Sequence, residues 1–106
     1  MTGFIPYDEK FIDKNLKVIK NINLNSHGVR RLGAASIDMC HVAKGIVEGF
    51  WEYNLQPWDT AAGNIIIHEA GGCVTNDNGN HYNFDKCIVA SNNNVHQDFL
   101  KIIKNS

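Results

Sequence analysis

One stretch of this chain, residues 57–72, constrains the fold more than any other part of the sequence. It reads PWDTAAGNIIIHEAGG, with proline at its start and paired glycines at its end. Both are typical boundary residues of a helix. Between them the residues are mostly small or apolar, which allows close packing against another element. Asp59 lies in the first turn, where a short carboxylate can point out of the helix end toward a ligand. The stretch therefore predicts a tightly packed helix at the edge of a binding site.

Length and composition bound the class of protein. The chain has 106 residues, 43% of them apolar and 20% charged, values that are ordinary for a folded soluble protein. This length predicts one domain over residues 1–106. The formal net charge is -1, which gives no electrostatic argument for binding nucleic acid or an anionic membrane.

Membrane insertion, secretion and disulfide formation are not expected. The sequence has no apolar run of about 18 residues that could cross a membrane. Its first residues lack the basic start and long apolar core of a signal peptide. Cys40, Cys73 and Cys87 are odd in number and show no CxxC spacing, so neither a disulfide framework nor a zinc site is indicated. We expect reduced, buried cysteines in a cytoplasmic protein.

Hydrophobic periodicity predicts alternating strands and helices along the whole chain. The order is approximately β-α-β-α-β-α-β-β-β-α, which indicates an α/β fold in which helices cover a mixed sheet. Expected strands lie at residues 2–5 (ended by Pro6), 28–32, 46–53, 73–76 and Cys87–Ser91. Expected helices lie at residues 8–20, 35–44 (closed by Gly45), 57–72 and after a cap at Asn93 or Asn94, with polar connections at 21–26 and 77–80.

The strand expected at residues 46–53 alternates in a way that singles out Glu52. Alternation puts Trp51 and Tyr53 on one face, and Phe50 and Glu52 on the other. The commoner role of such a glutamate is a solvated charge at a strand end. The functional alternative is an acceptor for a sugar or polyol hydroxyl, because strand ends beside helix starts are where α/β proteins bind ligands.

Asp59 allows two roles as well. Spacing alone favours a helix cap that accepts backbone N–H groups, since caps are so frequent. The alternative is a carboxylate ligand of Mg²⁺, an ion that proteins bind through oxygen atoms. One carboxylate cannot build such a site, and no DxD or similar acidic cluster lies near Asp59 in the sequence.

Gly33, Ala34 and Ala35 open a helix without any bulky side chain. This composition suits close helix packing, or backbone N–H groups exposed to an anion or a hydroxylated ligand. Other catalytic patterns are missing from the sequence. The five histidines have no metal-ligand spacing, and the sequence contains no HExxH motif, glycine-rich phosphate loop or GxSxG motif.

Taken together, these motifs resemble the C-terminal half of the inositol monophosphatase family. WDTAAG at residues 58–63, with Ile66 and then EAGG at 69–72, is similar to the C-terminal signature of that family. RRLGAASIDM at residues 30–39 resembles its Arg-x-x-Gly-Ser/Thr-Ala-Ala segment. Residues 2–4, 42–45, 49–52 and 90–92 also fit, so the resemblance covers nearly the whole chain.

The resemblance implies hydrolysis of phosphate monoesters of inositol or related small alcohols, dependent on Mg²⁺ and inhibited by Li⁺. It also implies an α/β/α/β/α sandwich that is usually a homodimer. By position, Asp59 matches the aspartate that ligates a catalytic metal and lies close to the substrate. Glu52 matches the glutamate that contacts inositol hydroxyls. Gly33, Ala34 and Ala35 match the helix start that lines the substrate.

Two departures from the family pattern shape the functional hypothesis. Ala34 stands where the family usually has serine or threonine. The family's N-terminal Gly-x-x-Glu and Asp-Pro-x-Asp-Gly-Thr motifs, which supply most metal ligands, have no counterpart in these 106 residues. We therefore expect the C-terminal domain of a phosphatase, inactive without the other half. The alternatives are a catalytically dead remnant that persists as a self-associating module, or a relative acting on a sugar bisphosphate or nucleotide phosphate.

Overall fold

A computed structural model of the chain describes residues 1–5 and 8–106, so Pro6, the expected end of the first strand, lies outside the described residues. Within that part the element order is α-α-β-α-β-β-α. None of these helices is both long and apolar enough to span a membrane. The elements are α1 (Ile12–Leu24), α2 (Ala35–Ala43), β1 (Gly49–Tyr53), α3 (Pro57–Glu69), β2 (Cys73–Thr75), β3 (Cys87–Ser91) and α4 (His96–Lys104).

The three strands form one sheet in the order β1-β3-β2, and both neighbouring pairs are antiparallel. In the register of β1 and β3, Glu52 lies opposite Ile88. Parallel pairing within the described residues is limited to an isolated bridge between Thr2 and Trp51. The predicted α/β class, with helices packed on a sheet, is confirmed, but the three-stranded sheet of the described residues is antiparallel and not the expected mixed sheet.

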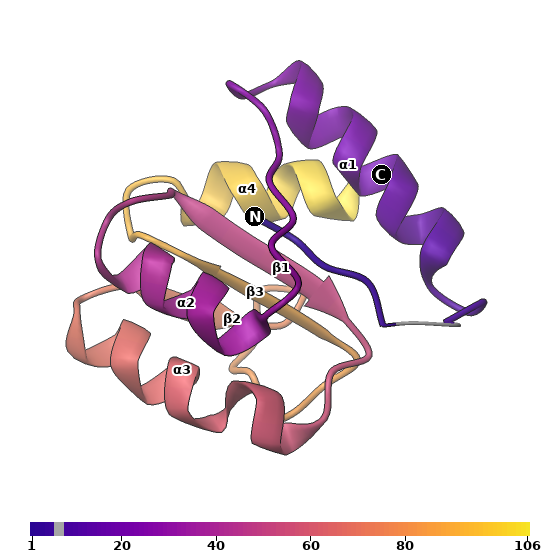
Figure 1. Cartoon of the computed structure of the whole chain (residues 1–106). Coiled ribbons are helices and arrows are strands. Elements are labelled where there is room, and N and C mark those ends of the chain that lie inside the picture. The colour runs from indigo at the N-terminus through magenta and orange to yellow at the C-terminus, as the bar shows by residue number, and fades with distance from the viewer. Residues whose placement is uncertain (6–7) are drawn as a thin grey trace.

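Helices cover both faces of the sheet, α1 and α4 on one side and α2 and α3 on the other (Figure 1). The two-residue alternation of the strands creates a separate apolar cluster on each face. The α1–α4 cluster is built on Val18, Ile22, Trp51, Tyr53, Cys87, Val89, Leu100 and Ile103. The α2–α3 cluster is built on Met39, Val42, Phe50, Ile67, Val74, Tyr82, Ile88 and Ala90.

Two expected strands are absent from the described structure. Residues 2–5 contribute only the bridge at Thr2, and residues 28–32 form no strand. The two segments meet through a single backbone bond, in which the Thr2 N–H donates to the Arg30 carbonyl at 3.1 Å. Gly28 and Gly33 have φ angles of 132° and 86°, which take the chain out of the extended conformation on both sides of Arg30.

Several element boundaries also differ from expectation, each for a local reason. The first helix starts at Ile12 instead of residue 8, because Asp8 Oδ1 accepts the backbone N–H groups of Lys10 and Phe11 in a preceding turn. It continues through residues 21–24, where a polar connection is expected from the sequence. Before α4, Asn92 takes the role expected of Asn93 or Asn94, since its Oδ1 accepts N–H bonds from Asn94 and Val95.

Other boundaries follow the sequence closely. The predicted strand Cys87–Ser91 is confirmed without change. Gly45 has φ 78° and ends α2 as expected, although β1 then begins only at Gly49, three residues later than the expected strand. All three cysteines are free thiols, but only Cys87 is fully buried, so the expected burial of Cys40 and Cys73 is wrong.

A buried histidine, His96, ties the start of α4 to the sheet. Its Nδ1 lies 2.6 Å from Ser91 Oγ, and its Nε2 lies 2.9 Å from Thr75 Oγ1. A neutral imidazole can donate through one nitrogen and accept through the other, so it can bridge both hydroxyls. Burial lowers the pKa of His96, which means that the folded state favours this neutral form.

We expect His96→Gln to lower the free energy of unfolding by roughly 1–3 kcal/mol at pH 7.5, because buried hydroxyls lose a partner. The pKa of His96 is lower in the folded state than its value of 6.5 in the unfolded state. The contribution of the neutral imidazole to the free energy of unfolding is therefore complete above pH 6.5 and is lost as the pH falls. The difference between wild type and His96→Gln should therefore shrink from pH 7.5 to pH 5. Urea titrations over that range measure it, with the exposed His68→Gln as control. A difference that stays constant with pH would contradict the proposed neutral bridge.

Candidate active site

Asp59 is the third residue of α3, and its carboxylate is tied to the helix start. Gln56 is the N-cap residue and Pro57 the first helical residue. The Gln56 backbone N–H donates to Asp59 Oδ2 at 3.0 Å. Asp59 is thus not the N-cap that spacing predicted; it lies at the third helical position and accepts the backbone N–H of the N-cap residue, Gln56. This bond uses Oδ2 alone and leaves Oδ1 able to face a ligand.

Glu52 lies near the end of β1 and points toward the α2–α3 side of the sheet. It is only 5% exposed, so the solvated charge that was considered the commoner role is wrong. Burial is the main cause that raises its pKa to about 7, and the carboxylates of Asp38 and Asp59 raise it further. The guanidinium of Arg31 acts in the opposite direction. Glu52 is therefore poised between its neutral and ionised forms near neutral pH.

Gly3 fits against the carboxyl group of Glu52. A Cβ atom at Gly3 would come within 2.9 Å of Glu52 Cδ and closer still to Oε1, so no other residue fits there without movement. A buried amide holds this segment in place, because Asn15 Nδ2 donates to the Gly3 carbonyl at 3.0 Å. Asn15 Oδ1 in turn accepts from Trp51 Nε1 at 2.6 Å. The position of Glu52 thus depends on contacts on both faces of β1.

Gly33, Ala34 and Ala35 form the start of α2, as predicted. Gly33 adopts φ 86°, Ala34 is the N-cap in an extended conformation, and Ala35 is the first helical residue. No side chain caps this helix, since alanine has no acceptor to offer. The backbone N–H groups of its first turn therefore remain available to an anion or a hydroxylated ligand.

The starts of α2 and α3 lie at the side of the molecule toward which β1 runs (Figure 1). The two helices approach closely because Gly63 faces Met39: a Cβ at Gly63 would lie 2.6 Å from Met39 Sδ. This confirms the close packing expected from the small residues of α3. The structure thus brings Asp59, Glu52 and the start of α2 to one edge of the fold.

One acidic residue near this edge, Asp38, was not predicted from the sequence. It is fully buried in α2, and neither carboxylate oxygen has a hydrogen-bond partner within the described residues. Burial raises its pKa, and its charge contributes to the raised pKa of Glu52. The available signal was its helical spacing, because Asp38 lies beside Met39 and one turn before Val42 on the buried face of α2.

The described residues do not by themselves fit a complete divalent metal site. No group of three or more His, Cys, Asp or Glu side chains among them could hold an ion. Mg²⁺ takes near-octahedral oxygen coordination and gives up its water reluctantly. Asp59 can supply one carboxylate oxygen, and Glu52, with its pKa raised to about 7, is only partly ionised near neutral pH. A metal at this edge would need ligands from outside these residues.

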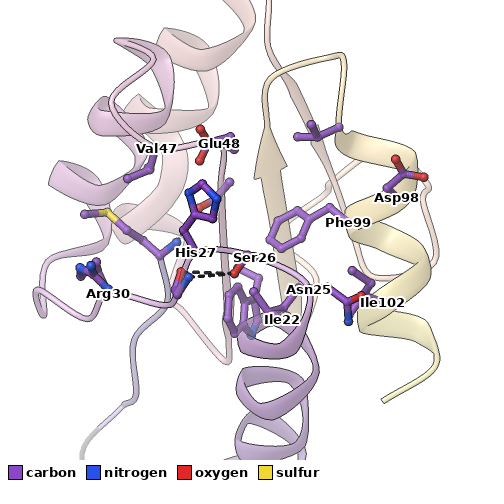
Figure 2. A pocket seen from close by; sticks show the side chains of 15 residues that line it. Ile22, Asn25, Ser26, His27, Arg30, Val47, Glu48, Asp98, Phe99 and Ile102 are labelled. Carbon is purple, nitrogen blue, oxygen red and sulfur yellow. Dashed lines mark hydrogen bonds between the residues drawn. The ribbon is translucent and has the colours of Figure 1, made fainter.

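The main cavity of the described structure, with a volume of about 450 Å³, lies away from these residues. Figure 2 shows its lining, which comes from the connection between α1 and α2, the start of β1 and α4. Neither Asp59, Glu52 nor the start of α2 contributes to it. The candidate site is therefore separate from this cavity.

Comparison with known proteins assigns the chain and its fold to a family. Residues 6–106 match the inositol monophosphatase family. The chain is 46% identical over 104 residues to the chloroplastic phosphatase IMPL1 of Arabidopsis thaliana, covering 97% of this chain and 28% of that protein. It is 47% identical over 103 residues to the putative Nus factor SuhB of Neisseria meningitidis serogroup B, covering 96% and 40%.

Solved structures give the same assignment. The extragenic suppressor protein SuhB of Bartonella henselae superimposes with a TM-score of 0.90 at 36% identity, over 99% of this chain and 40% of that one. The chain belongs to the inositol monophosphatase family. It spans well under half the length of these relatives, 28% of IMPL1 and 40% of each SuhB protein.

The environment of Glu52 leads to a stability prediction. Folding raises the pKa of Glu52 from 4.5 to about 7. The free energy of unfolding of the protein therefore falls as the pH rises through that window. Glu52→Gln removes this loss, so the variant should exceed wild type in unfolding free energy by about 3 kcal/mol at pH 8 and not at pH 4. Denaturant titrations at the two pH values measure the difference. The matched control is Glu69→Gln, which changes an exposed carboxylate at the end of α3.

Proposed function

We propose that this chain is the C-terminal part of a Mg²⁺-dependent phosphatase that hydrolyses inositol monophosphate or a related small phosphate monoester. We further propose that it is inactive without the N-terminal part of such an enzyme. The observation that carries the proposal is the meeting of Asp59, Glu52 and the uncapped start of α2 at one edge, in a chain of the inositol monophosphatase family.

Each of these groups has chemistry that suits one role. Asp59 contributes one carboxylate oxygen to a metal beside the substrate, and the N-terminal part supplies the remaining ligands. Glu52 in its ionised form accepts a hydrogen bond from a polyol hydroxyl. The backbone of Gly33, Ala34 and Ala35 lines the substrate with N–H donors. Inhibition by Li⁺, a homodimeric assembly and a cytoplasmic location complete the proposal, the last because all three cysteines are free.

The outer surface of α2 and α3 supports the proposal of a missing layer. Ile37, Trp58, Ile65 and Ile66 are 54%, 78%, 64% and 42% exposed on these two helices. Helices that are apolar on every side normally lie buried between two layers. An N-terminal part packed on this surface would cover these side chains and place its own groups opposite Asp59. The choice among inositol phosphate, a sugar bisphosphate and a nucleotide phosphate then depends partly on that part.

The same surface favours a second candidate function, a catalytically dead remnant that acts as a self-associating module. Large exposed apolar patches mark interaction sites. Sedimentation of the 106-residue chain over a concentration series separates the two ideas. A monomer at high concentration counts against self-association. A stable oligomer that excludes an N-terminal part would favour it.

We expect the chain alone to release no phosphate from inositol monophosphate in the presence of Mg²⁺. Activity should appear when the N-terminal part of IMPL1, a relative that is 46% identical over this region, is supplied as a separate chain. A phosphate-release assay with and without that part, and with and without Mg²⁺, measures this. Phosphatase activity of the 106-residue chain by itself would refute the proposal.

In the assembled enzyme, Asp59→Asn should lower kcat by at least about 100-fold, because removal of one group that stabilises a transition state typically costs that much. The matched control is Glu69→Gln at the far end of the same helix, which should leave kcat unchanged. Sedimentation verifies that both variants still assemble. Equal activity of Asp59→Asn and wild type would remove Asp59 from the site.

A further inference from the structure

The first turn of α3 enters the protein interior at a single residue, Thr60. Thr60 is fully buried, whereas Pro57 and Trp58 are exposed. Asp59, directly before Thr60, is half-buried. The next buried residue of the helix, Gly63, comes almost one turn later. The position of Asp59 relative to the rest of the fold therefore depends on what Thr60 contacts.

The polar partner of Thr60 is a tyrosine hydroxyl far away in the sequence. Thr60 Oγ1 lies 3.1 Å from Tyr82 Oη, and both residues are buried. Tyr82 also belongs to the apolar cluster on the α2–α3 side of the sheet. Each hydroxyl can donate one hydrogen bond and accept another, so this contact satisfies two buried polar groups at once. Removal of either hydroxyl would leave the other without this partner.

Tyr82 comes from the connection between β2 and β3, residues 76–86, which is fixed by its own contacts. Asp85 Oδ2 accepts hydrogen bonds from Asn76 Nδ2 and from the Asn83 backbone N–H, each at 3.2 Å. The rings of Tyr82 and Phe84 meet edge to face, with centroids 5.6 Å apart. The connection therefore holds the Tyr82 hydroxyl in a defined place.

Asp59 lies close enough to Tyr82 for its charge to act on the phenol. Burial is the main cause that raises the pKa of Tyr82, and the hydrogen bond to Thr60 lowers it. The charges of Asp85 and Asp59 are among the further causes that raise it. The phenol therefore keeps its proton near neutral pH and remains a neutral partner for Thr60.

Two hydrogen bonds together restrain the carboxylate of Asp59. The first runs from the Gln56 backbone N–H to Asp59 Oδ2 and sets the side chain relative to the start of the helix. The second joins Thr60 to Tyr82 and sets the start of the helix relative to the β2–β3 connection. Catalytic rates depend steeply on the placement of groups that hold the reacting centre.

We propose that Thr60 and Tyr82 are positioning residues of the candidate active site, and that their shared hydrogen bond holds the Asp59 carboxylate in place. Both residues act through Asp59, because their hydroxyls are buried and engaged with each other. The catalytic consequence rests on the proposed function, whereas the restraint on Asp59 is a property of the 106-residue chain.

Hydrogen exchange of the Gln56 N–H in the 106-residue chain tests the restraint, because this N–H donates to Asp59 Oδ2. Thr60→Val and Tyr82→Phe should each accelerate the exchange by at least about threefold. Thr60→Ser keeps the hydroxyl and should stay near the wild-type rate. The matched control is Tyr53→Phe, which removes a buried hydroxyl on the opposite face of the sheet and should change nothing. Protected amides of β3 verify that each variant is folded. Unchanged Gln56 exchange in Thr60→Val and Tyr82→Phe, or equal acceleration by Tyr53→Phe, would overturn the proposal.

Kinetics of the assembled enzyme test the catalytic consequence. Thr60→Val and Tyr82→Phe should each lower kcat by about tenfold and keep KM within about twofold of wild type. The Mg²⁺ concentration for half-maximal activity should rise in both variants, a change that lower stability alone would not produce. The double variant should be no worse than the poorer single variant, since all three lack the same hydrogen bond. Wild-type kcat in both single variants, or additive losses in the double variant, would overturn the proposal. If the wild-type assembly releases no phosphate, the proposed function fails, and Gln56 exchange still decides whether Asp59 is restrained.

Discussion

The rest of the structure depends on the alternation of side chains along β1. Trp51 and Tyr53 enter the cluster with α1 and α4, while Phe50 enters the cluster with α2 and α3. The same alternation carries Glu52 to the α2–α3 side, next to two helix starts. Because the strand period is two, a shift of one residue would exchange the two clusters and bury Glu52 against α1 and α4. One register therefore fixes both cores and the candidate site together.

Much of this architecture could be predicted from sequence, and the failures share a cause. The strand Cys87–Ser91 and the opposite faces of Trp51 and Glu52 could be predicted from local sequence pattern. Burial of a strand on one face or on both faces shows directly in which of its residues are apolar. The segments 2–5 and 28–32 look like strands locally, yet they pair through single bonds set by tertiary position. Strand pairing is a long-range property, and short apolar runs carry little information about their partners.

The candidate site, too, could be predicted from the sequence only in part. Asp59 and the start of α2 could be placed from sequence because proline, glycine and alanine mark helix starts. The burial of Glu52 and the contribution of Asp38 could not, since both arise where separate elements meet. His96 and Leu100 likewise belong, with Ile103, to the buried face of α4.

The charges around Glu52 determine how its pKa would respond to a cation at this edge. Asp38 and Asp59 both raise the pKa of Glu52, and among the causes acting on it only the guanidinium of Arg31 opposes them. Any cation held near Asp59 would act in the same sense as Arg31 and lower the pKa of Glu52. The carboxyl would then ionise and become a pure acceptor for a ligand hydroxyl. If the proposed cation and hydroxyl ligands bind at this edge, their binding is linked through one proton, and each favours the other.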